Sequence, residues 1–170
     1  MIDTKRVDEA KSNVSHYLRD GLLVKRLSSP EIISVLVNNA RNSIDETFRV
    51  QTPLWKIVTS YYAMFYIANA VLSKLGYKVG ESIAHKVTSD ALIVYVQDKL
   101  RKGLLEEYEQ VQDEALAGIR ANDLVESFDL ERRKRSIFQY HTSQQALESK
   151  ALTSQKRARE FVAELMKLLN

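Results

Sequence analysis

Two side chains suited to phosphate chemistry stand close together in the last third of the sequence. Arg135 and His141 are separated by five residues, and Ser136 follows the arginine directly. Arginine keeps its charge at physiological pH and can donate two parallel hydrogen bonds to a phosphate group. Histidine titrates near neutrality, so it can accept or give up a proton. We therefore take Arg135, Ser136 and His141 as candidate catalytic residues.

The backbone between Arg135 and His141 decides whether the two side chains can meet. In one unbroken α-helix, six positions turn about 600°, which leaves the two side chains apart. Thr142-Ser-Gln-Gln145 has the pattern of a capping box, so we expect the last helix to begin there and His141 to lie just outside it. The positive helix end nearby would favour neutral His141. In the alternative, Arg135 pairs with an acid such as Glu131. His141 is then a partly buried residue packing beside Tyr140.

Four consecutive cations lead into this pair. A basic run of this kind can bind RNA phosphates without regard to base sequence, or it can be a solvated helix face. The net charge of the chain is only +3, which by itself does not imply nucleic acid. With one neighbouring aromatic residue, the candidate binding residues are Arg132, Arg133, Lys134 and Tyr140.

Several other chemistries have no support in the sequence. The chain has no cysteine, so a thiolate metal site and a cysteine nucleophile are excluded. Its three histidines have no matched acids at metal-site spacing. A glycine-rich phosphate loop and a Gly-x-Ser-x-Gly motif are also missing. We therefore predict no metal ion and no cofactor.

Composition indicates one helical domain. A chain of 170 residues is expected to form a single domain with its own core. Five glycines, two prolines and many strong helix formers favour an all-α fold, a helical bundle. No stretch approaches the roughly 18 apolar residues of a membrane span. The first residues do not resemble a signal peptide, so we expect a cytoplasmic protein without a membrane partner.

Start and stop signals divide the chain into six expected helices. Asp3 is a plausible N-cap, and Pro30 and Pro53 suit first helical positions. Gly76 is a natural end of the third helix. The expected helices are 3–21 (or weakly to 27), 30–48, 53–75, 83–100, 104–119 and one from 142 to the end.

The expected helices differ in their apolar faces. In the second, one stripe contains Ile32, Leu36, Ala40, Ile44 and Phe48. The fifth has a narrow, charged face, so we expect it on the outside of the bundle. Lys78–Ser82 is expected to be a loop. Arg120–Tyr140 gives no clear signal, although Asp123–Glu126 could open a helix with a capping box.

The third helix carries a cluster of aromatic residues. Tyr61, Tyr62, Phe65 and Tyr66 lie within two helical turns, and their spacing predicts packing in the core. Base stacking is an alternative, and Tyr62 and Tyr66 could instead form a dimer face. His85, like His16, is expected to be structural or solvated.

The string Ser60-Tyr-Tyr-Ala-Met-Phe-Tyr66, followed by Ala68, Ala70, Leu72 and Gly76, resembles the hallmark helix of the HEPN domain (higher eukaryotes and prokaryotes nucleotide-binding). His85-Lys86 is similar to a short element that often follows this helix in the family. Ala158-x-x-Phe-Val-x-x-Leu165 is similar to its closing helix. The resemblance covers about Glu31–Leu169. We therefore divide one compact unit into an N-terminal helical extension, 1–27, and a HEPN-like bundle, 28–170.

This resemblance implies an up-and-down bundle of four core helices plus one or two extra helices, often as a homodimer. Many members pair with a small nucleotidyltransferase in toxin–antitoxin systems. Active members are metal-independent ribonucleases whose motif is an arginine, four to six residues, and a histidine. Arg135 to His141 fits that motif, and it implies that Arg135 binds the scissile phosphate, His141 acts as acid and base, and Ser136 supports by hydrogen bonding.

Three functions follow from these expectations. The first is a non-catalytic HEPN module that binds a nucleotide, an RNA or a partner such as a nucleotidyltransferase through the bundle groove. The second is a toxin-type endoribonuclease that uses Arg135 and His141. The third is a helical scaffold with no link to nucleotides.

Overall fold

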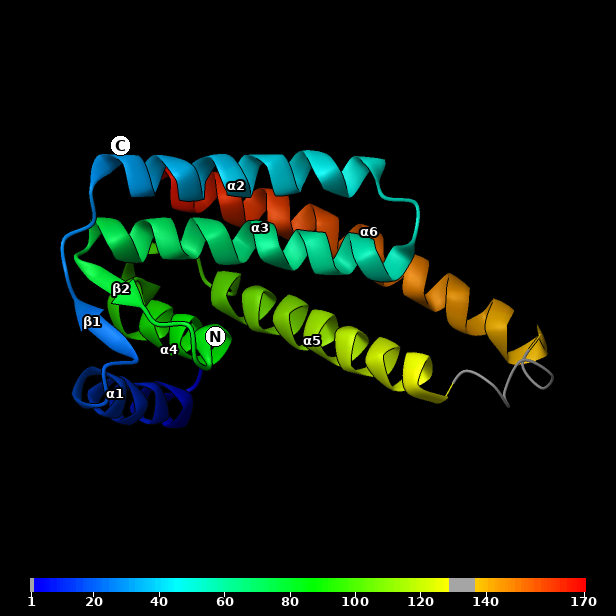
Figure 1. The fold of residues 1–170 in the computed structure, drawn as a ribbon, viewed down its shortest axis with the longest axis horizontal. Helices are drawn as coiled ribbons and strands as arrows, with labels where there is room; N and C mark the ends of the chain where they lie inside the picture. Colours follow the sequence, from blue (N-terminus) through cyan, green and yellow to red (C-terminus); the bar gives the residue numbers. More distant parts are fainter. Residues whose placement is uncertain (1, 129–136) are drawn as a thin grey trace.

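The structure is a computed structural model that describes the backbone of residues 2–128 and 137–170 and the side chains of 2–120 and 147–170. These residues form helices and one two-stranded ribbon, so the predicted all-α class is confirmed (Figure 1). The elements are α1 (Thr4–Arg19), β1 (Leu23–Lys25), α2 (Pro30–Arg49), α3 (Pro53–Lys74), β2 (Tyr77–Val79), α4 (Ala84–Tyr95), the 3-10 helix η1 (Gln97–Lys99), α5 (Leu104–Phe128) and α6 (Ile137–Lys167). The up-and-down order and the division into 1–27 and 28–170 stay predictions.

Helix α3 is the centre of the fold. It contacts α2, α4, α5 and α6, and Figure 1 shows α2 and α6 running alongside it. Its aromatic string supplies core residues, since Tyr61, Ala63 and Met64 are fully buried. The predicted ends are also confirmed: Pro53 opens the helix, and Gly76 follows its last turn with a φ of +84°, a value that glycine adopts readily.

The starts of α1 and α2 follow from their capping residues. The Asp3 carboxylate accepts a hydrogen bond from the Arg6 backbone N–H at 2.7 Å, as predicted for an N-cap. Ser29 precedes Pro30 at the start of α2. A hydrogen bond from the Ser29 side chain lowers the pKa of Glu31, which lies in the first turn of α2.

The predicted apolar stripe of α2 is wrong at both ends. Ile32 and Phe48 are 53 % and 55 % exposed, whereas Ala40 and Thr47 are buried. Four residues turn a helix by about 400°, so each step along this stripe drifts by about 40°. Over four steps the drift reaches about 160°, and Ile32 and Phe48 cannot face the same neighbour.

The β1–β2 ribbon replaces two expected features. Strand β1 forms where the first helix was expected to continue weakly to residue 27. Lys78 and Val79, which were expected in a loop, belong to β2. The strands are antiparallel, with Val24 opposite Lys78. Helix α4 ends at Tyr95, earlier than expected, and the 3-10 helix η1 covers only Gln97–Lys99 of the remaining stretch.

The position of α5 also differs from the prediction. Leu104, Tyr108, Val111 and Ala115 are completely buried, so α5 packs against α3 instead of lying outside the bundle. The helix runs on to Phe128, which places Asp123–Glu126 inside it and not at a helix start. The apolar face of α5 is narrow because acidic residues flank it. One row of apolar side chains is nevertheless enough to fill the space beside α3, so the helix is buried along that row.

Candidate functional site

The predicted catalytic and basic residues fall largely outside the described part of the chain. Arg132, Arg133, Lys134, Arg135 and Ser136 lie outside the described residues. Tyr140 and His141 belong to α6, and their side chains lie outside the described set. The proposed meeting of Arg135 with His141 therefore stays a prediction.

The predicted start of the last helix is wrong. Helix α6 begins at Ile137, so Thr142 is an internal position and His141 is the fifth residue of the helix. Ile137–Tyr140 contains no glycine or proline that would hold the chain out of a helix. His141 therefore does not lie just outside the helix, as the capping box had predicted.

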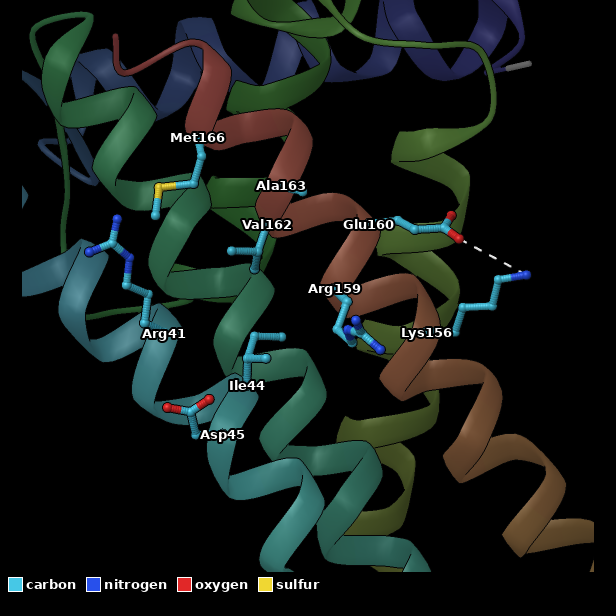
Figure 2. A pocket seen from close by; sticks show the side chains of 9 residues that line it. All are labelled: Arg41, Ile44, Asp45, Lys156, Arg159, Glu160, Val162, Ala163 and Met166. Atoms are coloured by element: carbon cyan, nitrogen blue, oxygen red, sulfur yellow. Dashed lines mark ion pairs between the residues drawn. The ribbon is translucent and has the colours of Figure 1, made fainter.

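The described residues form a different basic site, in a groove of about 700 Å³ between α2 and α6. Both helices pack on α3. Figure 2 shows Ile44 of α2 and Val162 of α6 pointing toward one another along the floor. Arg41 and Met166 stand at one end (Figure 2). We call this space the α2–α6 groove.

Two arginines define the charge of the α2–α6 groove. Arg41 comes from α2 and Arg159 from α6, and both are exposed. The Arg159 guanidinium lies over the Phe48 ring at 5.7 Å from its centre, a cation–π contact that reaches across to α2. Among the described residues, neither arginine forms an ion pair with a carboxylate. Both guanidinium groups are therefore available to an anion.

The other charged residues of the groove contribute less. Glu160 accepts a hydrogen bond from Arg101 at 3.0 Å and lies 4.0 Å from Lys156. Figure 2 shows Lys156 and Glu160 on the side of α6 that faces away from α2. Asp45 lies on the rim, one residue beyond Ile44. The groove itself is thus an apolar floor flanked by two arginines.

A buried hydrogen bond fixes α2 and α6 beneath the groove. The Gln155 side-chain amide donates to the Thr47 hydroxyl at 3.0 Å, and both residues are almost fully buried. A second hollow of about 380 Å³ shares Arg41 and Met166 with the groove and continues it to Pro30 and Asn170. The open channel therefore follows much of the α2–α6 junction, with Arg41 in its middle.

A second polar feature joins α3 to α4. The Tyr61 hydroxyl and His85 Nδ1 are 2.6 Å apart, and the His85 ring lies against the rings of Tyr61 and Phe65. Burial raises the pKa of Tyr61 and lowers the pKa of His85. At neutral pH the phenol therefore keeps its proton and the imidazole is uncharged, so this hydrogen bond joins two neutral groups. His85 was expected to be either structural or solvated, and its contacts with Tyr61 and Phe65 make it structural.

The described residues contain neither a membrane-spanning helix nor a metal-binding cluster. In 2–128 and 137–170, no helix has the length and apolar character that crossing a membrane requires. The described side chains also contain no cluster of three or more histidine, aspartate or glutamate residues placed to hold a metal ion.

Comparison with known proteins adds no relative, because no protein-family model, curated protein or solved structure matches this chain. Sequence reasoning also missed the two groove arginines. Each stands three residues before an inward branched side chain, Arg41 before Ile44 and Arg159 before Val162. That pattern places an arginine beside an apolar face, and it is the signal that would have found them.

Proposed function

We propose that this chain is a HEPN-type helical module that binds single-stranded RNA through the α2–α6 groove. The observation that carries the proposal is the pair Arg41 and Arg159, two guanidinium groups without carboxylate partners among the described residues, set beside an apolar floor. Arginine forks onto phosphate oxygens, and its plane also stacks on bases. The aromatic string of α3 supports the HEPN assignment.

The same proposal includes the partners that the HEPN resemblance implies. The module acts in the cytoplasm as a homodimer beside a small nucleotidyltransferase. An RNA or a free nucleotide would share the phosphate chemistry that two arginines recognise. We favour RNA because the groove continues past Arg41 into a second hollow, which suits a chain of phosphates better than one.

Fluorescence anisotropy with a short labelled single-stranded RNA tests this function. Replacing both groove arginines, R41A/R159A, should weaken binding by about tenfold or more, because two charge-assisted contacts are lost. Arg49→Ala is the matched control: it removes an exposed arginine of α2 that lies outside the groove, 3.8 Å from Glu46. Equal losses in R41A/R159A and R49A, or no binding by the wild type, would contradict the proposal.

A metal-independent endoribonuclease is the second candidate. Its supporting observation is that position 141 lies on α6 itself, 18 residues before Arg159, which corresponds to about 27 Å along the helix axis. An RNA strand in the groove that followed α6 would pass His141. Arg135 would then bind the scissile phosphate and His141 would exchange the proton.

Incubation of the protein with total RNA in EDTA separates the two candidates. Cleavage by the wild type and by His16→Ala, but not by folded Arg135→Ala or His141→Ala, would establish the nuclease. Intact RNA with the wild type, together with arginine-dependent binding, would establish the non-catalytic module.

A further inference from the structure

A second mixed pocket, of about 670 Å³, lies beside the β1–β2 ribbon, where the ribbon meets α2 and α3. Its walls come from the first turns of α2, the second half of α3 and the ribbon itself, which Figure 1 shows at one end of the molecule. None of its lining residues belongs to the α2–α6 groove. We call it the ribbon pocket.

One half of the ribbon pocket is apolar and includes aromatic rings. Phe65 and Tyr66 of α3 are half-buried there, with ring centres 6.2 Å apart. Ile32 is 53 % exposed, and Leu27 at the mouth is 85 % exposed. Large apolar side chains that remain this exposed around a hollow gain from any ligand that covers them.

The other half carries two cations on one face of the ribbon. Val24 pairs with Lys78, and the Arg26 backbone N–H donates to the Gly76 carbonyl at 2.9 Å, so the antiparallel pairing continues past β1. Side chains alternate along a strand, which puts Arg26 on the same face as Val24 and Lys78. Such diagonal neighbours are roughly 7–8 Å apart, a separation that one anionic group can bridge.

Neither cation is neutralised by the residues around it. Among the described residues, Arg26 and Lys78 form no ion pair, and Glu81, the acid of the pocket, is not within ion-pair distance of either. Two like charges on one short ribbon repel, and an anion between them removes that repulsion. The pocket therefore presents a positive rim above an apolar, partly aromatic wall.

We propose that the ribbon pocket binds a small anion with a flat apolar body. The body lies against Phe65, Tyr66 and Ile32, and the anionic group lies between Arg26 and Lys78. Mononucleotides and aromatic carboxylates or sulfonates share this chemistry. The site is separate from the RNA groove and goes beyond the function proposed above.

Titration with anilinonaphthalene sulfonate, an aromatic anion that fluoresces when it leaves water, tests the charged half. The double variant R26Q/K78Q should bind the probe about tenfold more weakly than the wild type. The control K25Q/R49Q removes the same charge from two exposed residues that do not line the pocket, one of them adjacent to Arg26. Equal affinity of R26Q/K78Q and K25Q/R49Q, or no binding by the wild type, overturns the proposal.

The apolar half has its own matched pair. Ile32→Ser removes a wall of the pocket, while Val35→Ser removes an equally exposed residue, 56 % against 53 %, from the same helix outside it. Because both are surface positions, both variants should fold. Weaker probe binding by I32S alone is expected. A loss with V35S as large as that with I32S places the probe elsewhere and overturns the proposal.

Competition identifies the ligand within the class. If AMP displaces the probe, the pocket is assigned to nucleotides. If naphthalene sulfonate displaces the probe and AMP does not, the pocket is assigned to other aromatic anions. Either result supports the proposal. The groove variant R41A/R159A should bind the probe like the wild type. Failure of the RNA experiment and failure of this one are therefore distinguishable. Loss of probe binding in R41A/R159A overturns a separate site.

Discussion

The hydrogen bond between Tyr61 and His85 is the shortest link between α3 and the start of α4. Tyr61 is fully buried, so its hydroxyl depends on protein partners where water cannot reach. His85 is only partly buried. The aromatic string recognised in the sequence therefore does more than fill the core: one of its hydroxyls holds the next helix in place.

Tyr61→Phe tests this link at the level of one atom. The ring packing stays, the hydrogen bond to His85 is lost, and the free energy of unfolding should fall by about 1 kcal/mol. Tyr62→Phe is the control, because the Tyr62 hydroxyl has no hydrogen bond within the described residues. Urea unfolding measures both, and equal stability of Y61F and Y62F would mean that the hydroxyl contributes nothing.

His85 should also make stability depend on pH. Burial lowers its pKa in the folded state, so the folded protein binds the proton less readily than the unfolded chain. Its contribution is complete above the unfolded pKa of about 6.5 and is lost as the pH falls from there through the folded pKa. The other charged residues that line the same pocket as His85 are Arg6, Lys86, Glu109 and Asp113.

The variants His85→Asn and His16→Asn measure that contribution. Both remove one imidazole, and only His85 is held against the core. Between pH 7.5 and 5.5 the wild type and H16N should lose more stability than H85N does, as followed by urea unfolding at each pH. Parallel pH curves for all three proteins would show that His85 is not the group responsible.

At the scale of elements, a polar network fastens α1 to the helices beside it. Arg6 of α1 contacts Asp90 of α4 at 2.7 Å and Glu109 of α5 at 2.7 Å. Asp90 is completely buried and also accepts hydrogen bonds from Tyr17 and Asn13. Removing one member of such a group leaves a buried charge without its partner, which costs more than the intact pair contributes.

Arg6→Met should therefore lower the free energy of unfolding by about 2–3 kcal/mol. Arg19→Met changes the other end of α1 at an exposed position and should change stability by less than about 0.5 kcal/mol. Denaturant unfolding of both variants decides. A loss in R6M no larger than that in R19M would mean that α1 is held by its apolar residues alone.

The link between α2 and α6 can be tested in the same way. Thr47→Val keeps the shape of the side chain but leaves the buried Gln155 amide without its acceptor, a loss of about 1–3 kcal/mol. Thr153→Val is the control, since the Thr153 hydroxyl is exposed and bonds only to the backbone of its own helix. Equal thermal stability of T47V and T153V would contradict a structural role for this bond.

Helix ends could be predicted from the sequence where a single residue starts or stops the helix. Asp3, Pro30, Pro53 and Gly76 act through their own side chain or backbone and need no partner. The strands were not predictable, because three residues are too few for an alternating pattern and their stability comes from pairing between β1 and β2. The buried face of α2 includes Thr47. Hydropathy predicts that a threonine is exposed, but the hydrogen bond from Gln155 of α6 allows this one to be buried.

At the scale of the whole molecule, α6 connects the two proposed functions. Figure 1 shows α6 continuing beyond the ends of α2 and α3, so one helix carries the groove in its second half and His141 near its start. The sequence analysis predicts phosphate chemistry at Arg135 and His141, whereas the proposed groove uses Arg159, which lies further along α6 than His141. Arg41 and Arg159 are 118 positions apart in the sequence, and only the packing of α2 and α6 on α3 brings them together.

The most direct test of RNA binding in the α2–α6 groove is the salt dependence of affinity. For single-stranded RNA the slope of log affinity against log salt is about −0.7 per phosphate contact. The variant R41A/R159A should therefore lose about 1.4 from the magnitude of that slope relative to the wild type, and R49A should keep it. An unchanged slope in R41A/R159A, or an equal reduction in R49A, would show that RNA does not bind in this groove.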